Sequence, residues 1–435
     1  MGVWGATALK PDDKIGSRSA PRSYSACASP RWGGKSGATS RDRHRAMKGI
    51  SVQALTAGVL AALVGFASAT VVIPGLLAVG ASPEQAASGL MALSIAMGVC
   101  GLAMSLTTRM PISVAWSTPG AALLASVGLI EGGFAAAVGA FLVCGLMIVI
   151  AGLLRPLGRW VAEIPSPIAN AMLAGVLLQL CLAPVEAVVE MPAMTLTVIV
   201  VWAVVARFWR LYAVPAAVAV TAVLIAVTTD LPPGSLTPVT PEPILVMPSF
   251  NIAALIGIAL PLFIVTMASQ NITGIAVLKT YDYSPPPGRI FTITGLFSLG
   301  AAPFGGHAVN LAAITAAMCA GEEAHPDRTR RYWAATTAGG CYVILGLLAG
   351  AAAGFMEASP PILIEAVAGL ALLSAFGGSL SSALQATDDR EAAAVTFIVT
   401  ASGLTVLGIG GAFWGLVAGG LIMTLSRWRR RPGTA

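Results

Sequence analysis

Long apolar stretches separated by short polar connections make up most of the chain from residue 52 onward. Fourteen such runs lie near 52–78, 84–106, 110–129, 134–154, 165–184, 193–209, 212–229, 251–277, 290–302, 306–320, 332–354, 359–380, 391–404 and 407–426. A helix needs about 20 apolar residues to cross a bilayer, and most runs approach that length, although the ninth, tenth and thirteenth are short. The pattern predicts an all-α polytopic membrane protein with about 14 transmembrane segments.

Composition supports this prediction. Hydrophobic residues make up 56% of the 435 residues and charged residues only 10%, whereas soluble domains carry about 25% charged residues. A soluble enzyme, a disordered protein and a nucleic-acid-binding protein are therefore excluded. Residues 1–46 hold nine Lys or Arg and three Asp, which accounts for the whole net charge of +6. We expect 1–46 to be a disordered basic cytoplasmic tail and 429–435 to be a second basic cytoplasmic tail.

The charged residues of the connections alternate in sign from one side of the predicted membrane to the other. With both termini inside, the cytoplasmic connections and the C-terminal end carry Arg109, Arg155, Arg159, Arg207, Arg210, Lys279, Arg289, Arg328, Arg330, Arg331, Arg390, Arg427, Arg429, Arg430 and Arg431. The opposite connections carry Glu84, Glu131, Glu186, Glu190, Asp230, Glu242 and Glu357, and no Lys or Arg. This asymmetry matches the positive-inside rule and predicts a multi-pass protein of the bacterial inner membrane with cytoplasmic termini.

A Pro-rich segment divides the chain into two halves. Residues 231–250 are predicted to be a periplasmic loop between spans 1–7, in residues 47–230, and spans 8–14, in residues 251–428. An odd number of spans in each half gives the two halves opposite orientations. The pattern therefore predicts a 7+7 inverted repeat, which many secondary transporters have.

One segment in the first half breaks the helical pattern. Pro111 disfavours helix before it, and residues 114–116 suit an extended strand. Thr118 followed by Pro119 is typical of a helix N-cap and first helical residue. The sequence predicts a short strand at the membrane midplane followed by a half-helix.

The second half contains a matching interruption at residues 302–310, before another apolar run. An offset of 193 aligns residues 114–117 with 307–310, which predicts a second short strand at the midplane with Asn310 as the cap of a second half-helix. Extended backbone at this depth needs hydrogen-bond partners, which two such strands would supply to each other. Two helix N-termini that converge there would form an anion site. The alternative is that both interruptions are kinks in ordinary spans.

Three motifs in these regions resemble those of one known family. They are MPISVAWSTPGAAL at 110–123, SQNITGIAVL at 269–278 and FGGHAVNLAAITAAM at 304–318. From about residue 47 to 428 the chain is similar to the bacterial benzoate:proton symporter family, which is related to the nucleobase:cation symporters. The resemblance implies fourteen spans in a 7+7 inverted repeat. It also implies a substrate-carrying core domain of spans 1–4 and 8–11, and a gate domain of spans 5–7 and 12–14.

His307 is the histidine predicted to lie at membrane depth, since His44 falls in the tail and His325 in a cytoplasmic connection. Ionisable groups inside the membrane are functional by default, and His changes charge near neutral pH. In the related nucleobase symporters a G-E-N-I-G pattern holds a carboxylate at this position, and Gly306–Asn310 matches its register. We predict that His307 binds the substrate carboxylate or relays the coupled proton. The alternative is a neutral His that joins the two strands.

Polar residues of the interrupted spans complete the predicted binding site. The nucleobase relatives have a carboxylate in span eight, whereas this chain has Ser269, Gln270 and Asn271 there. This difference removes a second proton carrier, and it suits an anionic substrate because a fixed carboxylate would repel it. The predicted substrate-binding residues are Ser117, Thr118, Gly120, Gln270, Asn271, His307, Ala308 and Asn310, with Trp116 as a candidate contact for an aromatic ring. The alternative is that these polar groups hydrogen-bond neighbouring helices, and structure is the favoured role for Ser68 and Thr70.

The predicted function is that of a secondary active transporter, which imports an aromatic carboxylate, with benzoate as the expected substrate, coupled to protons by alternating access. The alternatives are a transporter of the same fold for a nucleobase or another organic or inorganic anion, and a channel-like or structural membrane protein. No catalytic motif, Cys/His cluster or phosphate-binding loop occurs. We therefore expect no enzyme activity, cofactor, metal or nucleic acid. The expected partners are benzoate, protons and the lipid bilayer, and a homodimer is left open.

Overall fold

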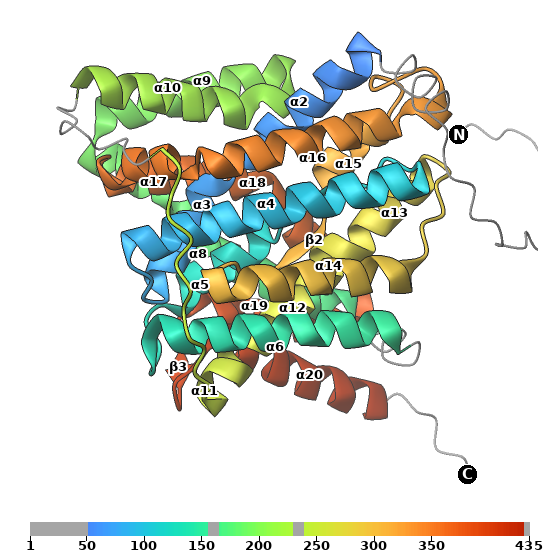
Figure 1. The fold of residues 1–435 in the computed structure, drawn as a ribbon. Coiled ribbons are helices and arrows are strands. Elements are labelled where there is room, and N and C mark those ends of the chain that lie inside the picture. Colours follow the sequence, from blue (N-terminus) through green and yellow to red (C-terminus); the bar gives the residue numbers. More distant parts are fainter. Residues whose placement is uncertain (1–50, 155–164, 229–238, 430–435) are drawn as a thin grey trace, which may run out of the picture. The chain divides into compact units, whose positions relative to one another are not determined.

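The computed structural model describes residues 51–154, 165–228 and 239–429, and these described residues belong to one compact unit. Several sequence predictions fall outside the described residues: both tails, the first part of the Pro-rich loop, and Arg155, Arg159, Asp230, Arg430 and Arg431. The chain is almost entirely helical where it is described (Figure 1).

The first half contains eight α-helices, one strand and one short 3₁₀ helix in the described residues. Their bounds are α2 (Val52–Phe66), α3 (Ala69–Ala78), α4 (Pro83–Thr108), β1 (Val114–Trp116), α5 (Thr118–Val127), α6 (Gly133–Leu153), α8 (Ser166–Glu190), α9 (Pro192–Phe208), η1 (Arg210–Tyr212) and α10 (Ala213–Thr228).

The second half is more broken. Its described elements are α11 (Ile252–Ala254), η2 (Leu255–Ala259), α12 (Leu260–Val265), η3 (Thr266–Ile272), α13 (Thr273–Thr280), α14 (Pro287–Ala301), η4 (Ala302–Phe304), β2 (Val309–Leu311), α15 (Ala313–Ala320), η5 (Arg328–Arg330), α16 (Tyr332–Leu347), α17 (Ala349–Glu357), α18 (Pro361–Leu384), η6 (Thr387–Asp389), α19 (Arg390–Ala401), β3 (Thr405–Val406), β4 (Ile409–Gly410) and α20 (Gly411–Arg429). The elements η2 and η3 are π-helical turns inside one continuous helical segment, 252–280.

Seven helical segments among the described residues are long and apolar enough to cross a membrane, or up to eight if the bent pair of residues 328–347 and 349–357 is one span. The protein is therefore a mostly helical, multi-pass membrane protein. Helices such as α5 and α15 are too short for length and composition to identify them as spans. The count of fourteen and the 7+7 repeat stay predictions.

The helices pack in two groups. In one group α16 packs along α2 and α4, α6 along α14, α3 against α5, and α13 against α15. In the other, α8 packs along α18, α19 and α20, and α9 packs against α10. The groups meet where α5 contacts α8 and α3 contacts α18. Each group draws helices from both halves of the sequence.

The two interruptions of the helical pattern pair with each other. Strands β1 and β2 form an antiparallel ladder in which Val114 lies opposite Leu311 and Trp116 opposite Val309. The first strand is where the sequence predicts it. The prediction for the second strand is wrong by two residues: it begins at Val309, because the Ser298 hydroxyl accepts the Val309 N–H at 2.8 Å and fixes the ladder there. The offset between the strands is therefore 195.

Both predicted helix caps are also corrected. Ser117, not Thr118, is the N-cap of α5, because its extended backbone lets its hydroxyl accept the Gly120 N–H. Asn310 lies inside β2, and Ala312 occupies the N-cap position of α15. Alanine has no side-chain acceptor, so α15 begins without a side-chain cap.

The described part of the Pro-rich connection is an extended strap, which runs from beside α17 to α11 (Figure 1). Its Val246 N–H donates to Pro303 O at 2.8 Å, and its Ile244 N–H donates to the Ser88 hydroxyl at 2.9 Å. Ser88 in turn donates to Phe304 O. The strap thus holds the turn that directly precedes Gly305 and His307.

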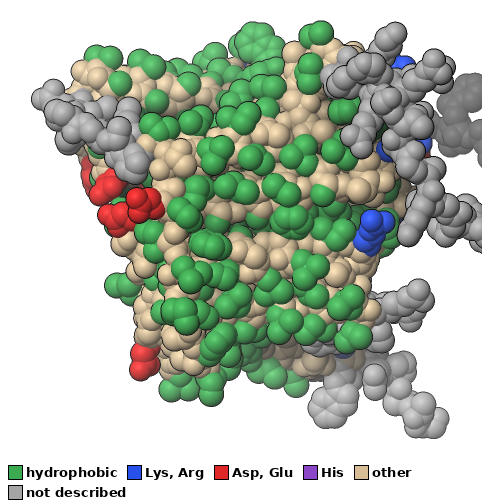
Figure 2. Space-filling model, viewed as in Figure 1, with side chains coloured by type: hydrophobic (Ala, Val, Ile, Leu, Met, Phe, Trp, Pro, Cys, Tyr) green, Lys and Arg blue, Asp and Glu red, His purple; other side chains and the backbone are tan. Residues whose placement is uncertain are grey.

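Charge is segregated on the surface. Figure 2 shows acidic side chains at one end of the visible face and basic side chains at the other, with hydrophobic side chains over the helices between them. The separation agrees with the alternation of charge along the sequence, and the apolar belt is a surface suited to lipid.

Candidate functional site

The candidate site lies along the β1–β2 ladder, between the starts of α5 and α15. The ladder is antiparallel, so the start of α5 lies beside Ala308 and the start of α15 lies beside Ser113, at opposite ends of the two strands. Ser117 is the main junction between them. Its N–H donates to Ala308 O at 3.0 Å, and its carbonyl oxygen lies 2.9 Å from His307 Nε2. The Asn310 amide, oriented to satisfy both of its groups, accepts from the same Ser117 N–H at 2.9 Å and donates to Leu311 O. Residues almost two hundred positions apart are thus joined by backbone and side-chain hydrogen bonds.

His307 is fully buried, with 0% of its surface exposed. A carbonyl oxygen only accepts, so Nε2 carries the hydrogen in the contact with Ser117 O. The Phe141 ring packs edge-on against the imidazole, with 6.3 Å between centroids. Nδ1 has no hydrogen-bond partner among the described residues. The imidazole therefore has one nitrogen fixed by the fold and a second nitrogen free to bind a proton or a ligand.

The hydroxyl of Ser117 and the nearby Gly120 have structural contacts. Ser117 Oγ accepts from the Gly120 N–H at 3.1 Å and from the Thr266 hydroxyl at 3.0 Å. A Cβ at position 120 would lie 2.5 Å from Leu262 Cδ1, so glycine lets α5 approach α12 closely. Both predicted binding residues therefore help hold α5 in place.

Thr118 and Trp116 share one acceptor. The Ser68 hydroxyl, in the break between α2 and α3, accepts from Trp116 Nε1 at 2.9 Å and from the Thr118 hydroxyl at 3.2 Å. It donates to Gly65 O. The hydrogens of Thr118 and Trp116 are thus already used, and the buried Trp116 ring packs against Phe66 at 5.7 Å between centroids. Ser68 therefore joins the break between α2 and α3 to β1 and the start of α5.

The polar residues of span eight lie in the π-helical segment η3. Buried Asn271 accepts the Leu311 N–H at 3.0 Å and donates to Met267 Sδ, so it supports β2. Gln270 is partly exposed, and its amide makes no hydrogen bond in the part of the chain that the structure describes. Single π-helical turns are often found at functional sites. No periodicity in the sequence predicts the π-helix, although the polar run 269–271 marks its position.

The start of α15 differs from that of α5. The helix begins after Ala312 without a side-chain cap, so the N–H groups of its first turn, residues 313–315, have no side-chain acceptor. Thr315 uses its hydroxyl in a 2.7 Å contact with Ser113. Ile314 is 58% exposed, so this turn reaches the surface of the protein. Free N–H groups and the positive end of a helix dipole favour an anion.

The site contains no arrangement typical of metal binding. Within residues 51–154, 165–228 and 239–429, no group of three or more His, Cys, Asp or Glu side chains is placed to hold a metal ion. The chemistry that the arrangement offers is hydrogen bonding to an anion and proton exchange at one imidazole nitrogen.

Comparison with known proteins identifies relatives along almost the whole chain. A protein from Escherichia coli K12 named inner membrane protein YdcO is 43% identical over 373 residues, which cover 84% of this chain and 94% of that protein. A benzoate membrane transport protein from Acinetobacter baylyi is 31% identical over 379 residues, which cover 85% of this chain and 94% of that protein.

Two solved structures have a similar fold at 14% sequence identity. The transmembrane domain of the cyanobacterial bicarbonate transporter BicA has a TM-score of 0.52 and covers 86% of this chain and 96% of its own. SLC26A9 has a TM-score of 0.53 and covers 93% of this chain and 74% of its own. The expected relation to nucleobase:cation symporters finds no support in these neighbours.

The family itself is defined by a match over most of the sequence. The family model described as benzoate membrane transport protein, BenE, matches residues 48–425, which include both strands, both half-helices and His307. The chain belongs to the BenE family of benzoate membrane transport proteins.

Proposed function

We propose that this membrane transporter imports an aromatic carboxylate, with benzoate as the expected substrate, together with protons and by alternating access. The proposed location is the bacterial inner membrane, with both termini in the cytoplasm. The observation that carries the proposal is the state of His307. The imidazole is fully buried, Nε2 is held by Ser117 O, and Nδ1 is without a partner among the described residues.

The residues around the proposed substrate have two roles: some bind its carboxylate, and the others hold the strands and half-helices in position. The carboxylate binds at the uncapped first turn of α15, where N–H groups are free and the helix dipole is positive. The Gln270 amide adds a donor from η3. Ser117, Thr118, Gly120, Asn271, Ala308 and Asn310 act mainly by holding the two strands and half-helices in position.

Proton coupling has a physical reason. Importing an anion against an inside-negative potential costs about 2.3 kcal/mol per 100 mV. A proton carried on His307 Nδ1 cancels this charge, and the pH gradient then drives uptake. Protonated imidazole donates from both nitrogens, so proton uptake turns Nδ1 into a charged donor.

Alternating access requires two bodies that move relative to each other. The two packing groups supply candidates, because the first holds β1, β2, α5 and α15, and the second holds α8–α10 and α18–α20. Full burial of His307 is what an occluded state would have, in which the imidazole is closed off from water until the groups move apart.

The test is uptake of radiolabelled benzoate into proteoliposomes with an imposed inward proton gradient. We expect saturable, gradient-driven uptake by the wild type, and loss of accumulation in His307→Gln, which keeps an amide donor but cannot titrate. His325→Gln is the matched control, because His325 is only partly buried and lies in the loop after α15.

The outcomes separate the parts of the proposal. If His307→Gln accumulates benzoate as the wild type does, His307 does not carry the proton. If folded wild type takes up no benzoate, the substrate is wrong, and a panel of nucleobases and other anions follows. Uptake that neither saturates nor depends on pH would indicate a channel.

A further inference from the structure

Arg331 is a buried cation at the far end of the half-helix that starts at the candidate site. Only 6% of its surface is exposed. Its NH1 donates to Ala320 O at 2.8 Å, and its Nε donates to His325 O at 2.7 Å. Ala320 is the last residue of α15. The guanidinium therefore binds the C-terminal end of α15 and orders the loop that follows it.

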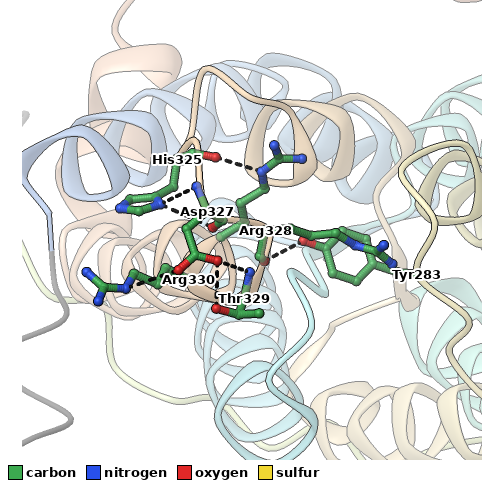
Figure 3. A network of polar contacts seen from close by, with 7 residues as sticks. Tyr283, His325, Asp327, Arg328, Thr329 and Arg330 are labelled. Atoms are coloured by element: carbon green, nitrogen blue, oxygen red, sulfur yellow. Dashed lines mark hydrogen bonds and ion pairs between the residues drawn. The ribbon is translucent and has the colours of Figure 1, made fainter.

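The charge of Arg331 is not paired with a carboxylate in the described residues. None of the three ion pairs found there includes it. Two acidic groups of this region have other partners. Asp282 pairs with Arg328, and Asp327 pairs with Arg330 and binds Thr329 (Figure 3). Glu322 and Glu323, which lie just after α15, are exposed. Burying a charge without an opposite charge is costly, so the position calls for a compensating interaction.

The helix α15 supplies part of that compensation and extends the effect of the charge. A cation at a helix C-terminus is stabilised by the negative end of the dipole. Eight residues at 1.5 Å each place the guanidinium about 12 Å behind the first turn of α15. The positive end of the dipole and the fixed cation thus act in the same direction at the N-terminus, where an anion gains from both.

The other half-helix, α5, has no comparable cation at its C-terminal end. The last turn of α5 contains no basic residue, and the helix ends at Val127 with Gly128 as its C-cap. Other cations of the loop after α15 do not substitute for Arg331, because the side chains of Arg328 and Arg330 are 44% and 50% exposed and are paired with carboxylates. Exposed, paired charges are screened by water.

We propose that Arg331 supplies the fixed positive charge that makes the start of α15 selective for an anion. It is a positioning residue, which acts through α15 and touches no substrate. The inference rests on the proposed function, in that it requires an anionic substrate at α15. At about 12 Å and the effective dielectric constant of protein sites, the loss of one charge weakens anion binding by about tenfold.

The test compares an anion with a neutral molecule of the same shape. Binding of benzoate and of benzamide is measured for purified wild type, Arg331→Gln, Arg331→Met and Arg331→Lys. Methionine keeps the apolar stem and often replaces a buried charge without loss of stability, so it serves if the Gln variant does not fold. Arg328→Gln is the matched control, since it removes an exposed charge from the same loop.

We expect benzoate to bind about tenfold more weakly to Arg331→Gln and Arg331→Met, with benzamide binding unchanged. Arg331→Lys should stay within about twofold of the wild type, and so should Arg328→Gln. The proposal is overturned if benzoate and benzamide weaken together, if Lys behaves as Gln does, or if Arg328→Gln shows the same loss. Wild type that binds benzamide but no benzoate overturns the proposed function as well, whereas normal wild-type binding with unchanged Arg331 variants overturns this inference alone.

Discussion

The half-helices α5 and α15 both follow paired strands, yet they differ in how their N-terminal and C-terminal ends are capped. The start of α5 is closed by the Ser117 hydroxyl, and Pro119 has no N–H to offer. The start of α15 follows Ala312 and has no side-chain cap. At the other end, the last turn of α5 before Gly128 has no basic residue, whereas the last carbonyl oxygen of α15 accepts a hydrogen bond from buried Arg331. The comparison teaches that similar backbone elements can have different roles, with α5 as a scaffold and α15 as the proposed anion-binding element.

The hydroxyl groups near α5 follow the same division. Thr118 and Trp116 give their hydrogens to Ser68, and Thr266 gives its hydrogen to Ser117. These donors are occupied within the protein, so a carboxylate would have to break existing hydrogen bonds to use them. At the start of α15 the first-turn N–H groups have no side-chain acceptor, so a carboxylate could bind them without breaking such hydrogen bonds.

The largest effect on benzoate affinity is expected from Ala312→Asp, which would give α15 the cap that α5 already has. The backbone of Ala312 already has the extended conformation of a cap residue, with φ −99° and ψ 123°. An aspartate there would bind the first N–H groups of α15 and place a negative charge beside them. We expect benzoate affinity to fall more than about tenfold, as measured by competition binding, and Ala312→Ser to cause a smaller loss. Benzoate binding equal to that of the wild type would exclude the start of α15 as the carboxylate site.

A moderate effect is expected from Ser117→Ala, which removes the cap from the other half-helix. The Gly120 N–H and the buried Thr266 hydroxyl both lose their acceptor, so the free energy of unfolding should fall by about 1–3 kcal/mol. Benzoate affinity of the folded variant should change less than in Ala312→Asp. Thermal unfolding in detergent measures the first effect, and Thr266→Val is the control that removes only one of the two contacts. A loss of affinity larger than that of Ala312→Asp would reverse the roles assigned to α5 and α15.

The smallest effect concerns the loop behind α15. Hydrogen bonds from the Thr329 side chain and N–H hold the pKa of Asp327 below its usual value. A carboxylate with a lowered pKa stabilises the folded loop at neutral pH, and this contribution is lost as pH falls below about 4. Hydrogen-exchange protection of residues 327–330, corrected for the intrinsic rate, should therefore drop between pH 6 and pH 3.5. In Asp327→Asn the protection of these residues should be low at both pH values. If protection in Asp327→Asn still falls between pH 6 and pH 3.5, the titrating group is not Asp327.

Local patterns in the sequence predict much of the architecture. Apolar runs locate the helices, Pro111 and the residues after it locate β1, and the depth of His307 in an apolar run marks it as a candidate. The family motifs at 110–123, 269–278 and 304–318 fall on β1 and α5, on η3 and α13, and on β2 and α15. These features depend on residues close together in the chain, and for that reason they can be read from it.

Other features were decided when distant segments packed together. The register of β2 against β1 depends on Ser298 and Asn271, which hold Val309 and Leu311, and for this reason the sequence misplaces the strand by two residues and the cap at Asn310. The tautomer of His307 depends on Ser117 O, 190 residues away. The π-helical turns and the burial of Arg331 behind α15 have no periodic signal in the sequence. The sequence by itself determined which segments are helical and apolar, because those choices are local; only the tertiary structure decided which hydrogen-bond donors are occupied and which stay free, because a donor's partner is set by the fold.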